Sequence, residues 1–286
     1  MPVYNGEKYI RKALDSLLAQ TFTDFELIIS DNASTDNTYS ICQEYAQKDS
    51  RIKVFRQAEN RGAEKNFAYV LYKAKGEYFM WAAYDDKCEL DCIEKLVCFL
   101  ESNPSIMLCT PDVRWIDNNG ETIRVSHLKG IYHSSESNWK QVRKQFFEYP
   151  LSNEIFFAVY GLYRTDFLKK QEGMSPTKGI MTAIENLFLA RLAIRGQIAA
   201  IPHVLKIYRT HEDSTYVREC QTLRKLDYIL LGLNIRKELL RIIIGSSDIT
   251  FSEKFSLLRT WILSILRAMA RRLILKPLLM VIKKRL

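Results

Sequence analysis

The chain lacks the cysteine spacing that binds zinc. Its six cysteines, at positions 42, 88, 92, 98, 109 and 220, form no paired C-x-x-C motifs. We therefore expect buried free thiols in a reducing compartment rather than a zinc site. The start of the sequence has no basic, apolar and small-residue leader, so no secretory signal is expected. No segment is low in complexity, and a hydrophobic content of 47% predicts a real core.

Acidic residues are absent from the last stretch of the chain. Residues 254–286 contain nine of the 42 basic residues and none of the 33 acidic ones, which leaves 33 basic residues to balance the acids elsewhere. The formal net charge of +9 therefore belongs to this tail, and the rest is formally neutral. Because a nucleic-acid-binding domain spreads basic residues over a face of its fold, the neutral body argues against nucleic acid as a partner.

Strand and helix patterns alternate over the first part of the chain. Apolar runs typical of strands cover 25–30, 52–55, 78–83 and 106–110, and helical spacing covers 8–20, 38–48, 65–75 and 90–100. Strands that alternate with helices of this length predict parallel βαβ units. The expected fold class is therefore α/β, with a mostly parallel sheet flanked by helices.

The second part of the chain has a looser pattern. It predicts a hairpin turn at 118–120, helices over 139–149, 182–193 and 223–244, and strands over 156–163, 198–201 and 204–208. Pro202 separates the last two strands, because proline has no amide hydrogen to give to a sheet.

Carboxylates follow two of the predicted strands. Asp31 begins the acidic turn after the strand over 25–30, and Asp85 and Asp86 follow the strand over 78–83. Parallel strands share a direction, so both clusters should lie at the same edge of the sheet, where α/β folds bind ligands. Oxygen ligands at such an edge suit a divalent cation that holds phosphates. The hypothesis is a metal-dependent site for a sugar nucleotide; the alternative is a pair of turns that cap helices.

Four sequence blocks, in order and at characteristic spacing, resemble the family 2 glycosyltransferases. The blocks are Pro2–Asn5 with Leu14–Gln20, Asp31–Asp36, Asn60–Asn66, and Gly76–Asp86. A looser resemblance continues to about residue 215 and includes Arg209 and His211. The family has a full apolar strand before its first block; here either that strand is severely shortened or the start site is placed late. The resemblance implies the GT-A fold, which is Rossmann-like, and a nucleotide-diphospho-sugar donor.

The resemblance also implies roles for residues near the nucleotide. Asp31 would accept a hydrogen bond from the base, as a carboxylate can read an imide N–H; its alternative role is a helix cap. Pro2 and Tyr4 would lie at the nucleotide, and Lys65 would approach the base or a phosphate. Tyr4 could instead be a half-buried core residue, and Lys65 could lie on a solvated helix face. Asp86 would hydrogen-bond the sugar or ribose.

The same resemblance suggests a metal and a base. Many members carry the metal-binding motif Asp-x-Asp-Asp. In this chain Ala83 replaces the first aspartate of that motif, and Asp85 and Asp86 remain. Asp85 would therefore bind Mn²⁺ or Mg²⁺. His211 would be a third ligand or a diphosphate donor, or else an ordinary packed residue. Glu185 would be the general base that takes a proton from the acceptor hydroxyl; otherwise it is a helix acid paired with a nearby basic side chain.

The tail pattern is that of an amphipathic helix. Seven apolar side chains between residues 255 and 273 fall within one arc of about 100° at helical pitch. They are Phe255, Leu258, Ile262, Ile265, Leu266, Met269 and Leu273. The uninterrupted apolar stretches are too short to span a bilayer. A basic amphipathic helix predicts contact with an anionic membrane surface, and the alternative is a helix packed on the domain.

Together these observations predict an inverting, metal-dependent glycosyltransferase. Residues 1–215 would form the catalytic domain, with a nucleotide-sugar half over 1–100 and an acceptor half over 101–215, and 216–286 would form a helical C-terminal region. The donor would be a UDP-sugar, with dTDP or GDP as alternatives. The acceptor would be lipid-linked or a polysaccharide, at the cytoplasmic face of the membrane. The alternatives are an inactive nucleotide-sugar-binding or scaffold protein, and a nucleotidyltransferase. The latter should carry a glycine-rich loop near residues 2–12, where only Gly6 stands.

Overall fold

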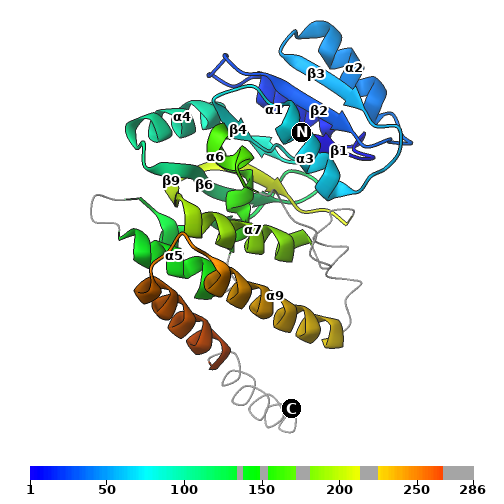
Figure 1. Ribbon diagram of the computed structural model, residues 1–286. Coiled ribbons are helices and arrows are strands. Elements are labelled where there is room, and N and C mark those ends of the chain that lie inside the picture. The colour runs from blue at the N-terminus through cyan, green and yellow to red at the C-terminus, as the bar shows by residue number, and fades with distance from the viewer. Residues whose placement is uncertain (134–137, 149–153, 172–180, 213–224, 267–286) are drawn as a thin grey trace, which may run out of the picture.

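The computed structural model describes residues 1–133, 138–148, 154–171, 181–212 and 225–266, and every structural statement refers to these ranges. Within them, strands and helices alternate along the first part of the chain as the sequence predicts (Figure 1). The first elements are β1 (Pro2–Val3), α1 (Ile10–Leu18), β2 (Leu27–Asp31), α2 (Thr38–Lys48), β3 (Ile52–Arg56), α3 (Ala63–Lys73), β4 (Tyr78–Met80), β5 (Lys87–Cys88) and α4 (Cys92–Ser102).

The later elements contain longer strands and longer helices. They are β6 (Ile106–Ile116), β7 (Thr122–Ser126), the 3₁₀ helix η1 (Lys129–Ile131), α5 (Trp139–Glu148), the 3₁₀ helix η2 (Glu154–Tyr160), β8 (Leu162–Arg164), α6 (Thr165–Lys169), α7 (Met181–Arg195), β9 (Gln197–Arg209) and α9 (Lys225–Gly245). A further helix covers residues 251–266. None of the described helices combines the length and low charge needed to cross a bilayer.

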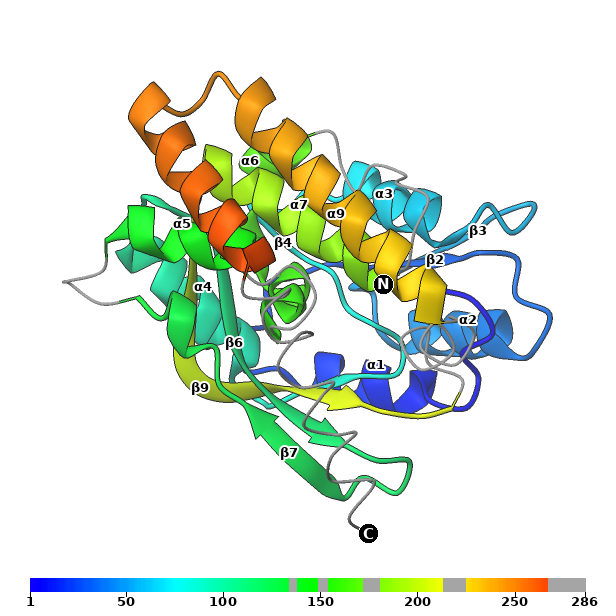
Figure 2. The same cartoon turned by 90° about the horizontal axis from the view of Figure 1, so that it is seen from below.

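The strands form two sheets. β1, β2 and β3 are parallel, and Val3 and Arg56 flank Asp31 at the end of β2. The second sheet has the order β4-β8-β6-β9-β5, and β7 pairs with β6 as a hairpin that projects from the molecule (Figure 2). In this sheet β6 and β9 are parallel, whereas the other pairs are antiparallel. The α/β class with helices around a central sheet is confirmed, and the second sheet is mixed.

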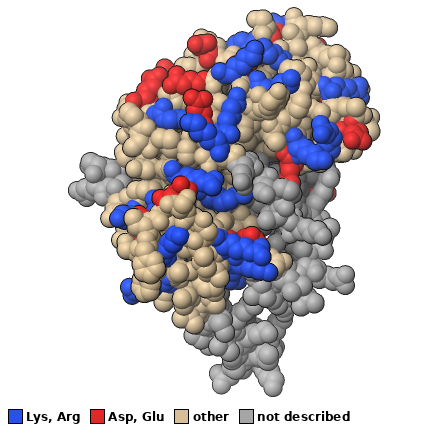
Figure 3. Space-filling view, viewed as in Figure 1, with Lys and Arg blue, Asp and Glu red and all other residues tan. Residues whose placement is uncertain are grey.

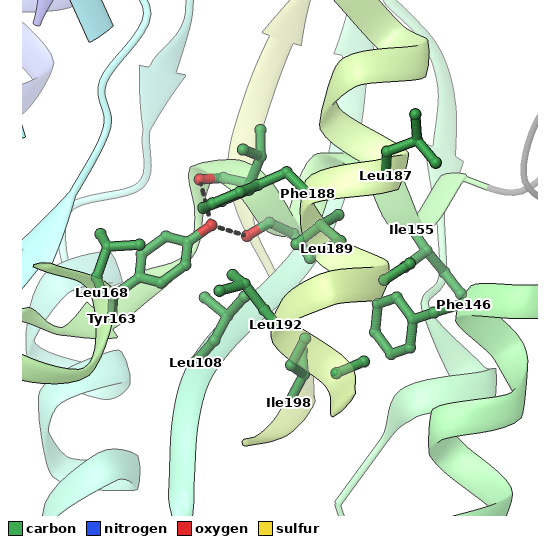
Figure 4. Packing of buried hydrophobic residues seen from close by; sticks show 14 of the residues in the cluster. Leu108, Phe146, Ile155, Tyr163, Leu168, Leu187, Phe188, Leu189, Leu192 and Ile198 are labelled. Carbon is green, nitrogen blue, oxygen red and sulfur yellow. Dashed lines mark hydrogen bonds between the residues drawn. The ribbon is translucent and has the colours of Figure 1, made fainter. Parts of the chain in front are cut away.

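Two apolar clusters hold the helices against the sheets. One joins α1 and α4 to β1, β2 and the start of β6, and the other joins α3, α5, α7 and α9 to the opposite side. In the second cluster, Tyr163 and Phe188 are fully buried beside Leu108 (Figure 4). The Tyr163 hydroxyl donates to the carbonyl oxygens of Val159, at 3.0 Å, and Ala158, at 3.4 Å. The hydroxyl therefore has hydrogen-bond partners inside an apolar core, as burial of a tyrosine requires.

The structure differs from the predicted strand over 156–163. Residues up to Tyr160 form η2, and only Leu162–Arg164 enters the sheet as β8. Between them the backbone passes very close to β6, since a Cβ built on Gly161 would lie 2.5 Å from the carbonyl oxygen of Cys109. An apolar run fits a buried 3₁₀ turn as well as a strand, so period alone does not separate them.

The two short strands predicted around Pro202 are one strand, β9. In the pairing with β6, Pro111 lies opposite Ile201 and Asp112 lies opposite Val204, so Pro202 and His203 bulge out of the ladder and are exposed. A bulge removes the need for the amide hydrogen that proline lacks. The strand therefore passes the proline and carries Arg209 to the end of the sheet.

A cavity of about 770 Å³ lies between the two sheets. It is lined by residues of β2 and β4, by α1, α3 and α4 above and below them, and by Met1. β1 pairs only with Ser30 and Asp31, so the first three residues of β2 have no strand partner from β1. The cavity lies beside this part of β2.

The C-terminal helices pack on the rest of the molecule. Ile235, Leu239 and Ile243 of α9 and Leu257 of the last helix belong to the same apolar cluster as α7. The Trp261 ring nitrogen donates to the carbonyl oxygen of Arg236 at 3.0 Å. The boundary predicted near residue 215 lies outside the described residues, as does the tail beyond residue 266.

Candidate active site

The loop after β4 places Asp85 against His211. Its carboxylate oxygen Oδ2 lies 2.9 Å from His211 Nε2. The imidazole is 4% exposed and packs on the ring of Tyr9, with 4.5 Å between the ring centroids. Its other nitrogen, Nδ1, is buried and has no hydrogen-bond partner among the described residues. The sequence prediction brought these two side chains together across 126 positions, and the structure places them in contact.

Asp86 points to a different set of partners. Its oxygen Oδ1 accepts a hydrogen bond of 2.9 Å from the backbone amide of Arg209. The residue as a whole is half-buried, but burial of its carboxyl, together with the charge of Asp85, raises its pKa well above the usual value. Adjacent carboxylates of this kind gain from a cation or donor that offsets their repulsion.

Arg209 connects the aspartates to a second loop. Its Nε donates to the carbonyl oxygen of Asp85 at 3.2 Å, and its Nη1 donates to that of Asp117 at 3.1 Å. Its guanidinium also lies over the ring of Tyr9, 5.4 Å from the centroid. The Tyr9 hydroxyl donates to Asn118 Oδ1 at 2.8 Å. One buried side chain therefore fixes the loop after β4 and the turn of the β6–β7 hairpin.

Glu185 lies in the first half of α7, and its residue is 5% exposed. The hydroxyl of Tyr160 donates to its Oε1 at 3.4 Å. Burial raises the pKa of Tyr160 well above its usual value, and the charges of Glu185, Asp86 and Asp85 raise it further. Asp86 and Tyr160 also line the same small cavity, so this hydroxyl connects Glu185 to the loop after β4.

Asp31 stands at the end of β2 and is fully buried. Its carboxylate accepts the amide hydrogen of Ser34 at 3.3 Å and pairs with Arg56 Nε at 3.5 Å. The turn is braced by Asn5, whose Oδ1 accepts the amide of Thr35 at 2.9 Å. Within the turn Ala33 has a φ of 61°, a left-handed conformation that is unusual for alanine.

The two acidic loops meet at Gly6. A Cβ built on this glycine would lie 2.6 Å from Cδ2 of Tyr84, the residue before Asp85. The amide of Gly6 donates to Thr38 Oγ1 at 2.7 Å, which ties the same backbone to α2. Among the described residues no hydrogen bond or ion pair joins Asp31 to Asp85; the loops that carry them are linked only through Gly6 and the ring of Tyr84.

The other nucleotide-binding predictions fall at the same end of the first sheet. Pro2 is buried in β1, Tyr4 is 41% exposed just after it, and Lys65 is exposed in the first turn of α3. None of the three has a contact that fixes it toward Asp31. Their placement allows a ligand contact, and their roles stay predictions.

Asp85 and His211 form a pair of potential metal ligands. In the described part of the chain no group of three or more His, Cys, Asp or Glu side chains could hold a metal ion. A pair fits Mg²⁺ or Mn²⁺, since such cations keep waters and bind substrate phosphates besides one or two protein ligands. The unpartnered Nδ1 of His211 leaves its tautomer free to change when Nε2 is engaged.

Sequence reasoning missed Tyr160 and undervalued Arg209. The stretch before Tyr163 was expected to be a strand, which hid the tyrosine of η2 that reaches Glu185. Arg209 was noted only for its spacing from His211, and its three backbone contacts depend on a register that the bulge at Pro202 sets. The sequence signal for a buried arginine would be the alternation of buried and exposed residues along β9. The bulge at Pro202 breaks that alternation.

Similar sequences come from several bacteria. A chain described as "Uncharacterized protein Rv1520" of Mycobacterium tuberculosis is 30% identical over 220 residues, which is 73% of this chain and 57% of that one. The "Putative glycosyltransferase EpsH" of Bacillus subtilis is 28% identical over 218 residues, or 76% of this chain and 61% of the relative. This chain thus spans about 60% of the length of these two relatives.

Solved structures share the fold. TarS 1-349 of S. aureus, in a complex with UDP-GlcNAc, has a TM-score of 0.66 at 20% identity over 91% of this chain and 70% of that chain. A mannosyltransferase from Pyrobaculum calidifontis, in a complex with GDP-Man and Mn²⁺, has a TM-score of 0.53 at 14% identity, over 91% of this chain and 77% of the other. The sequence profile described as "Glycosyl transferase family 2" matches residues 1–170, more than half of the chain. The chain belongs to glycosyl transferase family 2.

Proposed function

We propose that the protein transfers a sugar from a UDP-sugar to a hydroxyl of a lipid-linked or polysaccharide acceptor, with inversion at the anomeric carbon. The observation that carries this proposal is the small cavity that Asp86 and Tyr160 line together, with the Tyr160 hydroxyl hydrogen-bonded to Glu185. The carboxylates come from two different elements, the loop after β4 and α7. Such a set supplies both a cation site and a base.

The cation in this proposal is Mn²⁺ or Mg²⁺, held by Asp85 and His211. When bound, it would neutralise the charge that develops on the departing nucleoside diphosphate. Arg209 supports the site by fixing the backbone carbonyl of Asp85 and the carboxylate of Asp86. The Mn²⁺ named with the mannosyltransferase of Pyrobaculum calidifontis is consistent with this choice.

Glu185 is the proposed general base. Its carboxylate is buried and accepts a hydrogen bond from the Tyr160 hydroxyl at the long distance of 3.4 Å. An acceptor hydroxyl that takes the place of Tyr160 would give its proton to Glu185 as its oxygen attacks the anomeric carbon. Inversion follows when the attack comes from the face opposite the diphosphate.

The donor is placed on the other acidic loop. Asp31 would read the imide of uracil, with Arg56 and the braced turn from Asn5 to Thr35 holding its carboxylate in position. The Tyr84–Gly6 contact would set the distance between the base and the diphosphate. A UDP-GlcNAc complex of TarS, which shares the fold, supports a UDP-sugar as the first donor to test.

The location that we propose is the cytoplasmic face of an anionic membrane, reached through the C-terminal helix. Along residues 251–266, Leu257 is 2% exposed against the domain, whereas Phe255 is 66% exposed on the outer side. Phe251, Ile262 and Leu266 are exposed as well and fall on the same side at helical pitch. An apolar outer stripe followed by a basic tail matches the chemistry of an interfacial anchor.

The experiment is a thermal-shift screen of UDP-, dTDP- and GDP-sugars with and without Mn²⁺. We expect a rise in Tm with a UDP-sugar and Mn²⁺ together, and a smaller rise with either alone, because the diphosphate and the cation bind each other. A donor-hydrolysis assay on the same samples separates an enzyme from a protein that only binds the donor. A shift that is equal with and without Mn²⁺ would contradict the metal-dependent site.

A further inference from the structure

A second cluster of reactive side chains lies next to the donor site, in the pairing of β5 with β9. Cys88 stands directly opposite Lys206 in this antiparallel ladder, so their side chains share one face of the sheet. Lys206 is 9% exposed, and its Nζ lies 3.2 Å from the sulfur of Met80. A buried ammonium needs an anion nearby, and the proposed glycosyl transfer assigns no step to this lysine.

Cys88 also contacts a second thiol. Cys92, the first residue of α4, hydrogen-bonds the sulfur of Cys88. That hydrogen bond, and secondly the charge of Lys206, lower the pKa of Cys88 to about 6 although burial opposes the shift. The same arrangement raises the pKa of Cys92 well above the usual value, through its hydrogen bond to Cys88 and through burial. The arrangement therefore favours ionisation of Cys88 over ionisation of Cys92.

A small cavity gives access to this pair. It measures about 20 Å³, the room that one water molecule needs. Cys88, Lys206, Asp86 and Tyr160 are among the residues that line it. Peptide disulfides and other large electrophiles exceed this volume. The cavity thus places Cys88 next to Asp86 and leaves room for a small oxidant only.

We propose that Cys88 and Cys92 are a peroxide-oxidised thiol pair beneath the donor site. The thiolate of Cys88 attacks one oxygen of hydrogen peroxide, the O–O bond breaks, and the departing hydroxide takes a proton to leave as water. The sulfenic acid then reacts with the Cys92 thiol, which forms the disulfide and releases a second water. The two sulfurs together lose two electrons, which the peroxide accepts.

Oxidation would change the electrostatics of the donor site. In the reduced protein, Lys206 lies among Cys88, Cys92 and Asp86, and all three raise its pKa against the effect of burial. The disulfide removes the thiolate, so the ammonium of Lys206 keeps Asp86 as its remaining anionic neighbour. The conformation of Asp86, and with it the Arg209 backbone that it holds, would then depend on the state of the sulfurs.

The test is peptide mass spectrometry of the full chain after treatment with hydrogen peroxide at pH 7. We expect one cross-link between Cys88 and Cys92, with a loss of two hydrogens. Cys109, which is buried with no ionic partner, and exposed Cys98 serve as internal controls. Lys206→Met should slow the oxidation by about tenfold, because a smaller fraction of Cys88 is ionised.

A second variant covers the case in which the disulfide strains the fold. In Cys92→Ser, peroxide with dimedone should label Cys88 as the trapped sulfenic acid, at a rate above that of Cys98. Because these readouts are masses, they do not depend on whether the protein transfers sugar. Oxidation of Cys98 before Cys88, or an unlinked Cys88–Cys92 pair in the wild-type chain, would overturn the proposal.

Discussion

Arg209 is the residue on which the geometry of the site depends most. It is 2% exposed, and its amide and guanidinium contact Asp86, Asp85 and Asp117. A lysine would keep the charge but not the planar fork that reaches two carbonyl oxygens at once. Each hydrogen bond of a charged group that is lost in a buried place costs about 1.5–3 kcal/mol.

The prediction at this position concerns Arg209→Lys. We expect the free energy of unfolding to fall by about 2 kcal/mol and the affinity for a UDP-sugar with Mn²⁺ to fall at least tenfold. Urea denaturation and titration calorimetry measure the two effects. Arg114→Lys is the matched control, since Arg114 makes a half-exposed pair with Glu89 at 3.3 Å. Donor affinity that is unchanged in Arg209→Lys would show that the loop after β4 is held in another way.

At the scale of residues, the sequence predicted contacts better than orientations. Asp85 and His211 were expected in one site and lie 2.9 Å apart. The side chain of Asp86, however, turns toward the Arg209 amide, which local sequence does not reveal because the partner is 123 positions away. Such orientations depend on backbone donors and acceptors of strands that are remote in the sequence. The register of those strands depends in turn on bulges.

Among the elements, β1 has the least support. It has two residues, and beyond it lies the cavity of about 770 Å³. The amino group of Met1 donates to the carbonyl oxygen of Ile28 at 2.6 Å inside this region. Because β1 makes so few contacts, the stability of the fold should depend on whether the neighbouring Met1 amino group is protonated.

Burial lowers the pKa of the Met1 amino group from 8.0 to about 5, although the charge of Cys42 acts in the opposite direction. Between these two values the unfolded chain binds a proton that the folded chain does not, so stability should rise as the pH increases from about 5 to 8. The full change corresponds to about 4 kcal/mol. It should be absent below pH 5, where both states are protonated, and complete above pH 8.

Urea denaturation of the 286-residue chain at pH 5.5 and pH 8.0 measures this effect. The control is the same chain with an acetylated amino group, which carries no titrating charge and fits into the adjoining cavity. Its stability should change less over the window. Equal pH profiles for the two forms would contradict the burial of the amino group.

Helices were easier to predict than strands. The bounds of α2 agree with the predicted 38–48, and α7 extends the predicted 182–193 by a few residues. The hairpin turn expected at 118–120 joins β6 to β7, but β7 and the outer half of β6 were not predicted as strands. β7 is exposed along most of its length, so the alternation of its five residues does not mark a buried face.

For the whole molecule, the uneven charge is the main feature. Figure 3 shows Lys and Arg scattered over the described surface, with uncharged surface between them on the lower part where the C-terminal helix lies. The outer stripe of that helix is apolar, and residues 254–286 carry no acid. Attraction to an anionic lipid surface adds to the apolar contact.

We predict that the full chain sediments with vesicles that contain phosphatidylserine and less with vesicles of phosphatidylcholine alone. Binding should weaken as salt is raised, because exposed charges are screened. Replacing Phe255 and Ile262 by serine removes part of the outer stripe and should reduce binding several-fold. The matched control is serine at Ile123 and Val125, which are exposed on β7 far along the chain. Equal loss in both double variants would place the membrane contact elsewhere.

The central claim is that Glu185 removes the proton from an acceptor at a site that Asp85 and His211 complete with a cation. The most direct measurement is the rate of sugar transfer by Glu185→Gln, together with its affinity for the UDP-sugar and Mn²⁺, with Glu44→Gln on the surface of α2 as the control. We expect a normal fold, donor affinity within about twofold of wild type, and a rate at least 10²-fold lower. Turnover near that of the wild type would remove Glu185 from the mechanism.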